Sequence, residues 1–79
     1  MEMIQVISTN ITAIGWEGNV KINDDSPKRD VLRVLFSHGA IYDLLNVPKE
    51  IYEEFLKADS KGSFYNRKLK NNYCAIRRD

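Results

Sequence analysis

The sequence predicts an α+β fold, in which a small antiparallel sheet of three to four strands is packed on one face by two C-terminal helices. In the first half of the chain, short β-branched and aromatic runs alternate with turn residues, which is typical of antiparallel strands. In the second half, apolar residues recur with helical spacing after Pro48. The 79 residues, of which 43% are hydrophobic and 29% charged, fit a single domain over residues 1–79.

The first two strands are expected around residues 4–6 and 11–16, where isoleucine, valine and tryptophan gather. Serine, threonine and asparagine at positions 8–10 separate these runs as a tight turn. The chain then becomes mostly polar, with Val20 and Ile22 as a candidate short strand before a turn that ends in proline. We therefore expect an extended, exposed hairpin over residues 17–31.

The clearest strand signal is a hairpin between Leu32 and Leu44. Apolar residues alternate on both sides of a three-residue turn, in which Gly39 is expected in the left-handed region. This loop length fixes three apolar cross-strand pairs: Phe36 with Ala40, Val34 with Tyr42, and Leu32 with Leu44. On the opposite face, Arg33 should meet Asp43 as a pair of opposite charge.

The first helix is expected to begin near Pro48, whose fixed φ suits a first turn, with Asn46 as a nearby cap. Acidic residues in its N-terminal half complement the helix dipole. Apolar residues spaced four apart form one stripe that can pack on the sheet: Ile51 with Phe55, and Tyr52 with Leu56. This helix should end near Ala58 or Asp59.

Ser60 is expected to cap a second helix through its hydroxyl group. Three side chains are its expected inward positions: Phe64, Leu69 and Tyr73. Gly62 falls in the first turn, where glycine costs about 1 kcal/mol relative to alanine. A glycine at this point indicates either close packing at a sharp corner between the helices or the close approach of a ligand.

The composition argues against several classes of function. Cys74 is the single cysteine, so neither an internal disulfide nor a zinc site is expected, and a reducing, cytoplasmic location is favoured. No apolar run is long enough to predict a membrane span. His38 lies in a turn without an evident partner, and Asp24 and Asp25 alone are too few ligands for a metal. The sequence therefore predicts no enzyme, no cofactor and no metal site.

Positive charge is concentrated near the C-terminal end, although the net charge of the chain is only +1. From Ser60 onward, the single acidic side chain of Asp79 is accompanied by these basic residues: Lys61, Arg67, Lys68, Lys70, Arg77 and Arg78. Basic residues mixed with aromatic ones such as Tyr65 are typical of surfaces that bind single-stranded nucleic acid. The solvated face of an ordinary helix would have a similar composition.

Four groups of residues occur in the order and spacing of a known family. They are Ser8 with Ile11-x-x-Ile14-Gly15-Trp16, then Leu32-x-Val34-x-Phe36-x-x-Gly39-x-x-Tyr42, then Val47-Pro48 with Tyr52, and finally Ala58-x-Ser60-Lys61-Gly62-x-Phe64-Tyr65-Asn66. Over residues 8–70 the chain resembles the KTSC domain, which occurs at the C-terminus of some lysyl-tRNA synthetases and as small stand-alone bacterial and phage proteins. The resemblance implies a small α+β domain and, through the synthetase association, an RNA-binding role.

Two features depart from that family's pattern. Its central Tyr-x-Tyr appears here as Tyr42-Asp43-Leu44, so a role that needs paired tyrosines is not carried over. The segment between Trp16 and Leu32 is also longer than usual, and it coincides with the expected extended hairpin.

Two classes of function remain open from the sequence. The leading hypothesis is a non-catalytic module that binds nucleic acid, RNA in particular, or a phosphate-bearing nucleotide, because a helix N-terminus with glycine permits close approach of phosphate. Its expected anion site consists of Ser60, Lys61, Gly62, Tyr65, Arg67, Lys68 and Lys70. In the purely structural interpretation, the same serine is a helix cap and the same glycine makes room at a corner.

The alternative hypothesis is a protein-interaction module that acts as a homo-oligomer or through a sheet edge. Such a module could be a phage-encoded inhibitor of a host protein or a sponge for a nucleotide signal. A chain as short as this one gains stability by association, and the hairpin over residues 17–31 offers exposed surface for it.

Overall fold

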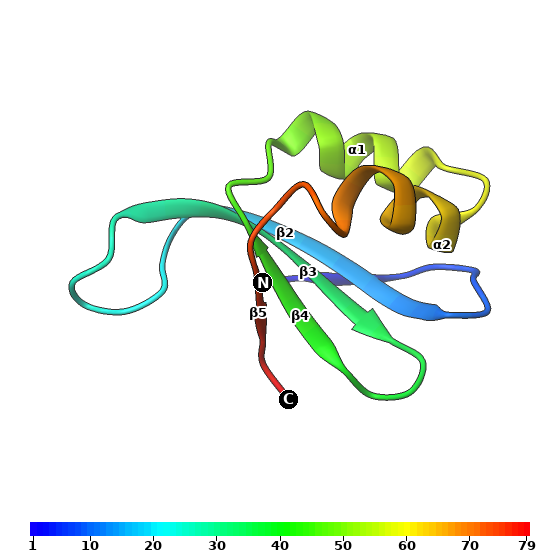
Figure 1. The fold of residues 1–79 in the computed structure, drawn as a ribbon, viewed down its shortest axis with the longest axis horizontal. Helices are drawn as coiled ribbons and strands as arrows, with labels where there is room; N and C mark the ends of the chain where they lie inside the picture. The colour runs from blue at the N-terminus through cyan, green and yellow to red at the C-terminus, as the bar shows by residue number, and fades with distance from the viewer.

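The computed structural model describes residues 1–79 and shows one antiparallel sheet covered on one face by helices (Figure 1). The strands are β1 (Met3–Gln5), β2 (Ile11–Lys21), β3 (Lys28–Phe36), β4 (Ile41–Leu45) and β5 (Ala75–Arg77). The helical segments are α1 (Lys49–Lys57), α2 (Lys61–Phe64) and the π-helical η1 (Tyr65–Leu69). The strand order is β1-β2-β3-β4-β5, so each strand pairs with its neighbour in the sequence. The predicted α+β class is confirmed.

The sheet has five strands, so the predicted number of three to four is wrong. The additional strand is β5, which pairs antiparallel with β4 and places Arg77 opposite Tyr42. Its one half-buried side chain is Ile76, so it lacks the alternation of apolar and polar residues that marks a strand in a sequence. β5 forms because the outer edge of β4 offers unpaired backbone groups to the returning chain.

The hairpin of β2 and β3 is the longest feature of the fold, and its tip extends well beyond the helices (Figure 1). β2 continues without a break from the sheet into this extension, with a bulge between Glu17 and Val20 where Asn19 has a φ of 57°. At the tip, the hydroxyl oxygen of Ser26 accepts hydrogen bonds from the backbone N–H groups of Ile22 and Asn23. The polar sequence of residues 17–31 therefore forms an extended hairpin.

The register of the hairpin between β3 and β4 confirms the prediction. Val34 lies opposite Tyr42, Leu32 opposite Leu44, and Arg33 opposite Asp43. The Phe36 N–H donates to the Ala40 carbonyl at 2.9 Å, and Gly39 in the turn has a φ of 100°. Loop length and the alternation of apolar residues are enough to fix this pairing.

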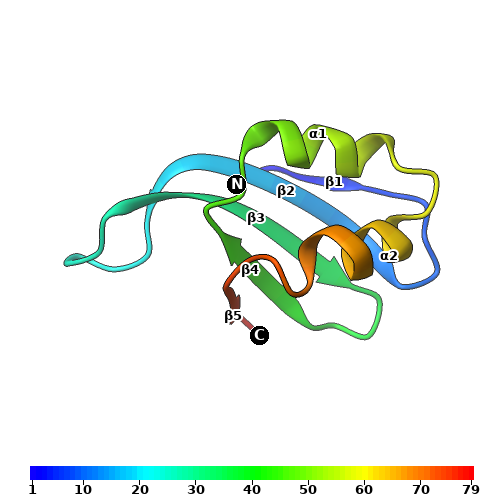
Figure 2. The same cartoon turned by 45° about the horizontal axis from the view of Figure 1, so that its top comes forward.

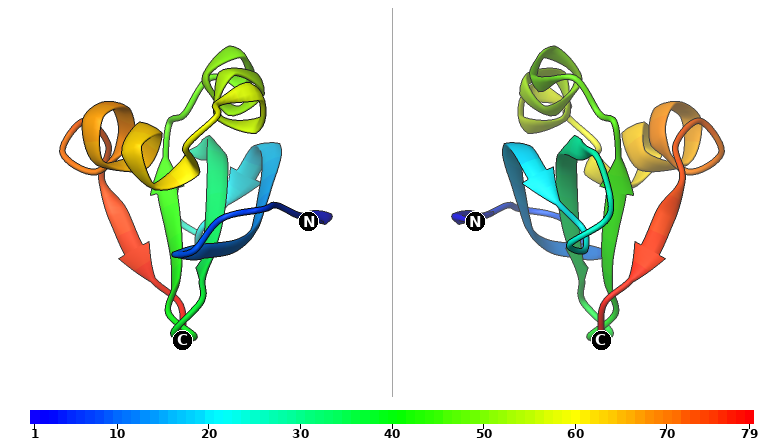
Figure 3. Two further views of the ribbon diagram at one scale, coloured as in Figure 1. Left: turned by 90° about the vertical axis from the view of Figure 1, so that its right-hand side faces the viewer. Right: turned by 90° about the vertical axis from the view of Figure 1, so that its left-hand side faces the viewer.

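The core lies between the sheet and the helices (Figures 2 and 3). Its buried members are Ile11, Ile14, Leu32, Val34, Leu44, Val47, Phe55, Phe64 and Leu69. α1 lies over β1 and β2, whereas α2 lies nearer β4 (Figure 2). The rings of Phe55 and Phe64 stack at a centroid distance of 5.2 Å and join the two helices.

Trp16 fixes the start of α1 on the sheet. Its indole Nε1 donates a hydrogen bond of 2.8 Å to the carbonyl of Val47, and its ring stacks on Tyr52 at a centroid distance of 6.4 Å. Pro48 precedes the helix at φ −62°, whereas Asn46 lies in the left-handed region at φ 63°. No side chain caps α1, so the expected role of Asn46 as a cap is wrong.

The second helix begins as predicted and ends differently. The Ser60 hydroxyl accepts a hydrogen bond of 3.2 Å from the Ser63 N–H, which confirms the cap. After Phe64 the helix widens to π geometry, in which the Lys70 N–H donates to the Tyr65 carbonyl at 2.8 Å. Phe64 and Leu69 are buried as expected, whereas Tyr73 lies beyond the helix and packs against the core only in part.

Candidate functional site

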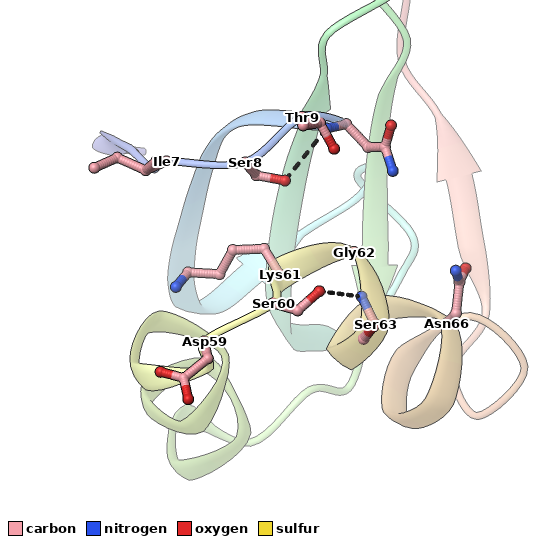
Figure 4. A pocket seen from close by; sticks show the side chains of 10 residues that line it. Ile7, Ser8, Thr9, Asp59, Ser60, Lys61, Gly62, Ser63 and Asn66 are labelled. Carbon is pink, nitrogen blue, oxygen red and sulfur yellow. Dashed lines mark hydrogen bonds between the residues drawn. The ribbon is translucent and has the colours of Figure 1, made fainter.

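A polar cleft lies where the turn after β1 meets the corner between α1 and α2 (Figure 4). It has a volume of about 330 Å³. Its walls are formed by Ile7, Ser8, Thr9, Asn10, Asp59, Ser60, Lys61, Gly62, Ser63 and Asn66. Only Ile7 among these residues is hydrophobic, so the cleft presents hydroxyl, amide and charged groups to the solvent.

The turn at residues 8–10 forms one wall because Ser8 holds it in shape. The Ser8 hydroxyl oxygen accepts hydrogen bonds of 3.3 Å from the N–H groups of Asn10 and Ile11. This local arrangement is the usual way in which serine stabilises a turn. The end of this turn is also bonded to the loop after β3, because the Ser37 N–H donates a hydrogen bond of 2.9 Å to the Asn10 carbonyl.

The corner at residues 60–63 forms the opposite wall. Ser60 caps the Ser63 N–H through its hydroxyl and the Phe64 N–H through its carbonyl. Across the cleft, a Cβ atom added at Gly62 would lie 3.4 Å from the Asn10 side-chain nitrogen. Because glycine has no side chain, the space between the two walls stays open and the backbone at this position remains accessible.

Lys61 is the single basic residue that lines the cleft. Its ammonium group donates a hydrogen bond to the carbonyl of Ala58, the C-cap residue directly after α1. This bond satisfies one of the carbonyl groups left over at the end of that helix. An ammonium group has three donors, and this bond uses one of them.

The structure separates the other predicted site residues from the cleft. Arg67, Lys68 and Lys70 are exposed on the π-helical segment and the residue after it, and they do not line the cleft. Tyr65 packs edge-on against Phe36 at a centroid distance of 5.1 Å, and burial raises the pKa of its hydroxyl group. Of the predicted anion site, the fold therefore brings together Ser60, Lys61 and Gly62 only.

The remaining basic residues of the C-terminal end are held by acidic partners. Arg77 forms a 2.8 Å ion pair with Asp79, and Arg78 lies 3.4 Å from the carboxylate of Asp43. Asp43 also receives a two-point contact from Arg33, at 2.7 and 2.9 Å, and that hydrogen-bonded contact raises the pKa of the Arg33 guanidinium. The positive charge seen in the sequence is thus partly neutralised in the fold.

Sequence reasoning missed several cleft residues, namely Thr9, Asn10 and Asn66. Asn66 follows the serine and glycine in the same motif, so its inclusion was within reach of the sequence. The turn at residues 8–10 is more than fifty positions from the corner, and no local pattern places it there.

No helix in the structure is both long and apolar enough to cross a membrane.

A family model described as the KTSC domain matches residues 7–73. The chain belongs to the KTSC domain family. An uncharacterized protein of Stutzerimonas stutzeri is 30% identical over 70 residues, covering 89% of this chain and 86% of the relative. A protein of Tsukamurella paurometabola is 31% identical over 74 residues, covering 94% and 97%. The crystal structure of a KTSC domain protein from Yersinia pestis, 24% identical, superposes with a TM-score of 0.80 over 99% of this chain and 97% of that one.

Most residues that carry the KTSC pattern support the fold of this domain. Trp16 contacts both Val47 and Tyr52, so these parts of the pattern meet at the start of α1. Gly15 passes so close to β1 that an added Cβ would lie 2.6 Å from the Glu2 carbonyl. Ser8 and the run from Ser60 to Gly62 also belong to the KTSC pattern but lie outside the core, and they face each other across the polar cleft.

Proposed function

We propose that this KTSC domain is a non-catalytic module that binds a phosphate-bearing ligand, either a nucleotide or the backbone of single-stranded RNA, in the polar cleft. The single observation that carries the proposal is the composition of the cleft, in which eight of the ten lining residues have polar side chains and one of these is lysine. Hydroxyl groups, backbone amides and an ammonium group are the donors that bind phosphate in proteins.

The corner at residues 60–63 supplies the donors. The first N–H groups of a helix have no carbonyl partner within that helix. Ser60 accepts from the N–H groups of Ser63 and Phe64, which leaves those of Lys61 and Gly62 for a ligand. Gly62 has no side chain to keep a phosphate oxygen from this backbone. The hydroxyl groups of Thr9 and Ser63 line the same cleft and add donors on both walls.

A longer ligand would reach the exposed basic residues next to the cleft. Asn66 lines the cleft, and Arg67 and Lys68 follow it directly on the exposed surface of η1. Successive phosphates of a single strand are neutralised by such a series of cations. Binding rather than catalysis is proposed because the cleft contains neither histidine nor cysteine, and Asp59 is its one carboxylate.

The proposal is tested by fluorescence anisotropy with a labelled single-stranded RNA, and by calorimetry with a nucleoside triphosphate and with inorganic phosphate. RNA binding should weaken steeply as salt increases, because phosphate contacts release counterions. The variant Lys61→Ala/Arg67→Ala/Lys68→Ala should lose nearly all RNA binding. The control is Lys21→Ala/Lys28→Ala, which removes two of the positive charges of the distal hairpin, where these exposed residues lie opposite each other.

Gly62→Ala separates the ligand role from the structural role. Its Cβ would meet only the flexible end of Asn10, so the domain should keep its stability or gain up to about 1 kcal/mol from better helix propensity. The same Cβ narrows the cleft and should weaken phosphate binding. Absence of binding to all three probes at low salt would contradict the proposal, as would an equal loss in the distal control.

A further inference from the structure

The exposed apolar surface of the protein is concentrated at one edge of the sheet. Three large hydrophobic residues are exposed, and all belong to the first seven positions: Met1, Ile4 and Ile7. Ile4 is 41% exposed within β1, and Ile7 directly after it is 99% exposed. Isolated exposed residues of this kind are common, but here all three lie in or next to the same edge strand, which favours a role in interaction.

The outer edge of β1 is free to pair with another strand. Val6 N–H donates to the Thr12 carbonyl on the β2 side, and Ile4 lies opposite Ile14. Because hydrogen-bonded pairs alternate along antiparallel strands, the backbone groups of Met3 and Gln5 point away from β2. These groups have no strand partner, since β1 is the first strand of the sheet.

The sequence of β1 lacks the features that usually protect an edge strand. No charged residue and no proline occurs between Glu2 and Glu17. Natural sheets block unwanted pairing with lysine, proline or bulges along their edges. The opposite edge of this sheet does carry charge, since Arg77 is part of β5 and Arg78 follows it.

A groove beside β1 provides space for the side chains of an added strand. It has a volume of about 490 Å³ and lies between β1 and the C-terminal end of α1. Its apolar lining comes from Ile4, Val6, Ile7, Leu56 and Ala58. Its charged residues are Lys57 and Lys61 with Asp59, so this end of the groove is basic.

We propose that β1 pairs antiparallel with β1 of a second copy of this chain, so that two sheets join across a twofold axis at Ile4. In this register, Met3 and Gln5 of each copy exchange backbone hydrogen bonds, and the two Ile4 side chains meet on the helix-covered face. A twofold interface requires a self-complementary surface, and an uncharged strand satisfies this requirement without opposing like charges.

Charge complementarity selects a second copy as the occupant. With Ile4 at the axis, Glu2 of one copy lies opposite Val6 of the other, where Lys57 lines the groove. Glu2 directly precedes β1, and an extended continuation of the strand in the dimer would place its side chain on the face of Ile4, since side chains two apart point the same way. Each copy therefore brings an acidic residue to the basic end of its partner's groove, and the contact occurs twice.

The test is the oligomeric state of the full chain by sedimentation velocity over a concentration series up to about 100 µM, where mass action favours association. The wild-type protein should sediment as a dimer at the upper end. Ile4→Lys places two like charges at the axis and should give a monomer with an unchanged circular dichroism spectrum. Arg77→Ala, at the opposite edge of the sheet, is the matched control and should remain dimeric.

Charge reversal tests the register. Glu2→Lys and Lys57→Glu should each weaken dimerisation by about tenfold or more at low salt, and the double variant should restore it. A wild-type monomer throughout the series, a dimeric Ile4→Lys variant, or a double variant without recovery would overturn the inference. If the protein stays monomeric but binds an added extended peptide along β1, the occupant of this edge is a different chain and the proposed dimer is wrong. The inference does not rest on phosphate binding, which Ile4→Lys should leave intact.

Discussion

On the helix-covered face of the sheet, Ile14 and Leu44 are fully buried under α1 and α2, whereas the opposite face carries the ion pair of Arg33 and Asp43. The first face is stabilised by apolar burial, which has no direction and tolerates small shifts. The second face has no helix over it (Figure 3), and Asp43 is nevertheless only 3% exposed because two arginine side chains cover it. The comparison shows that long charged side chains can shield a sheet face from solvent where no helix packs on it.

The largest expected effect is on the apolar face. Phe55→Ala removes a fully buried ring that stacks on Phe64, and should lower the free energy of unfolding by about 3–5 kcal/mol. For a domain of this size that loss approaches the whole stability. Urea denaturation followed by circular dichroism measures it, with Glu54→Ala on the exposed side of α1 as the control. A loss below about 1 kcal/mol would contradict the assignment of Phe55 to the core.

The next effect tests the charged face. Asp43→Ala leaves Arg33 and Arg78 close together without their shared carboxylate, and should cost about 2–3 kcal/mol. Arg78→Ala is the matched control, since its more exposed contact at 3.4 Å should contribute less than about 1 kcal/mol. Chemical denaturation of both variants measures the two values. Equal losses would mean that Asp43 acts mainly through Arg78 instead of Arg33.

A third prediction concerns the close contact between Gly15 of β2 and the chain at the start of β1. Gly15→Ala puts a Cβ atom 2.6 Å from the Glu2 carbonyl and 2.7 Å from the Met3 sulfur, so β1 must shift. We expect a loss of about 1–3 kcal/mol and faster hydrogen exchange in β1. Gly62→Ala, which meets no backbone, is the matched glycine control. Full stability in Gly15→Ala would show that β1 is loosely attached.

The smallest effect depends on pH. A hydrogen bond from Arg77, followed by one from the Ile41 N–H, lowers the pKa of Asp79 from 3.8 to about 2. A carboxyl group whose pKa is lowered by folding stabilises the protein above its ordinary pKa, and that contribution is lost as pH falls toward 2. Asp79→Asn should therefore lower the urea midpoint slightly at pH 7, and the gap should close between about pH 4 and 2. A gap that persists at low pH would contradict this origin.

Local patterns predicted the elements in which neighbouring residues decide the structure. The hairpin of β3 and β4 followed from alternation and loop length, and Arg33 met Asp43 as expected. The cap at Ser60 followed from its place between two helical patterns. Within the candidate site, Ser60, Lys61 and Gly62 were predicted together because they are adjacent in the chain.

Long-range contacts decided what the patterns did not show. β5 has little apolar character and forms only because β4 presents a free edge. The basic and aromatic residues after Lys61 were interpreted as one mixed surface. In the fold, however, Tyr65 packs against Phe36, and Arg78 forms an ion pair with Asp43. The π-helical segment η1 also has no sequence signature.

By itself, the sequence determined the α+β class, the central register and the cap of the second helix, because hydrogen bonding and side-chain alternation act over a few residues. Only the tertiary structure decided the fifth strand, the polar cleft and the free apolar edge of β1. Each of these features brings together segments that are far apart in the chain. The fifth strand pairs with β4, the cleft lies between residues 8–10 and 60–63, and the edge strand β1 lies beside the end of α1. Their proximity results from packing around the shared core, and no local pattern encodes it.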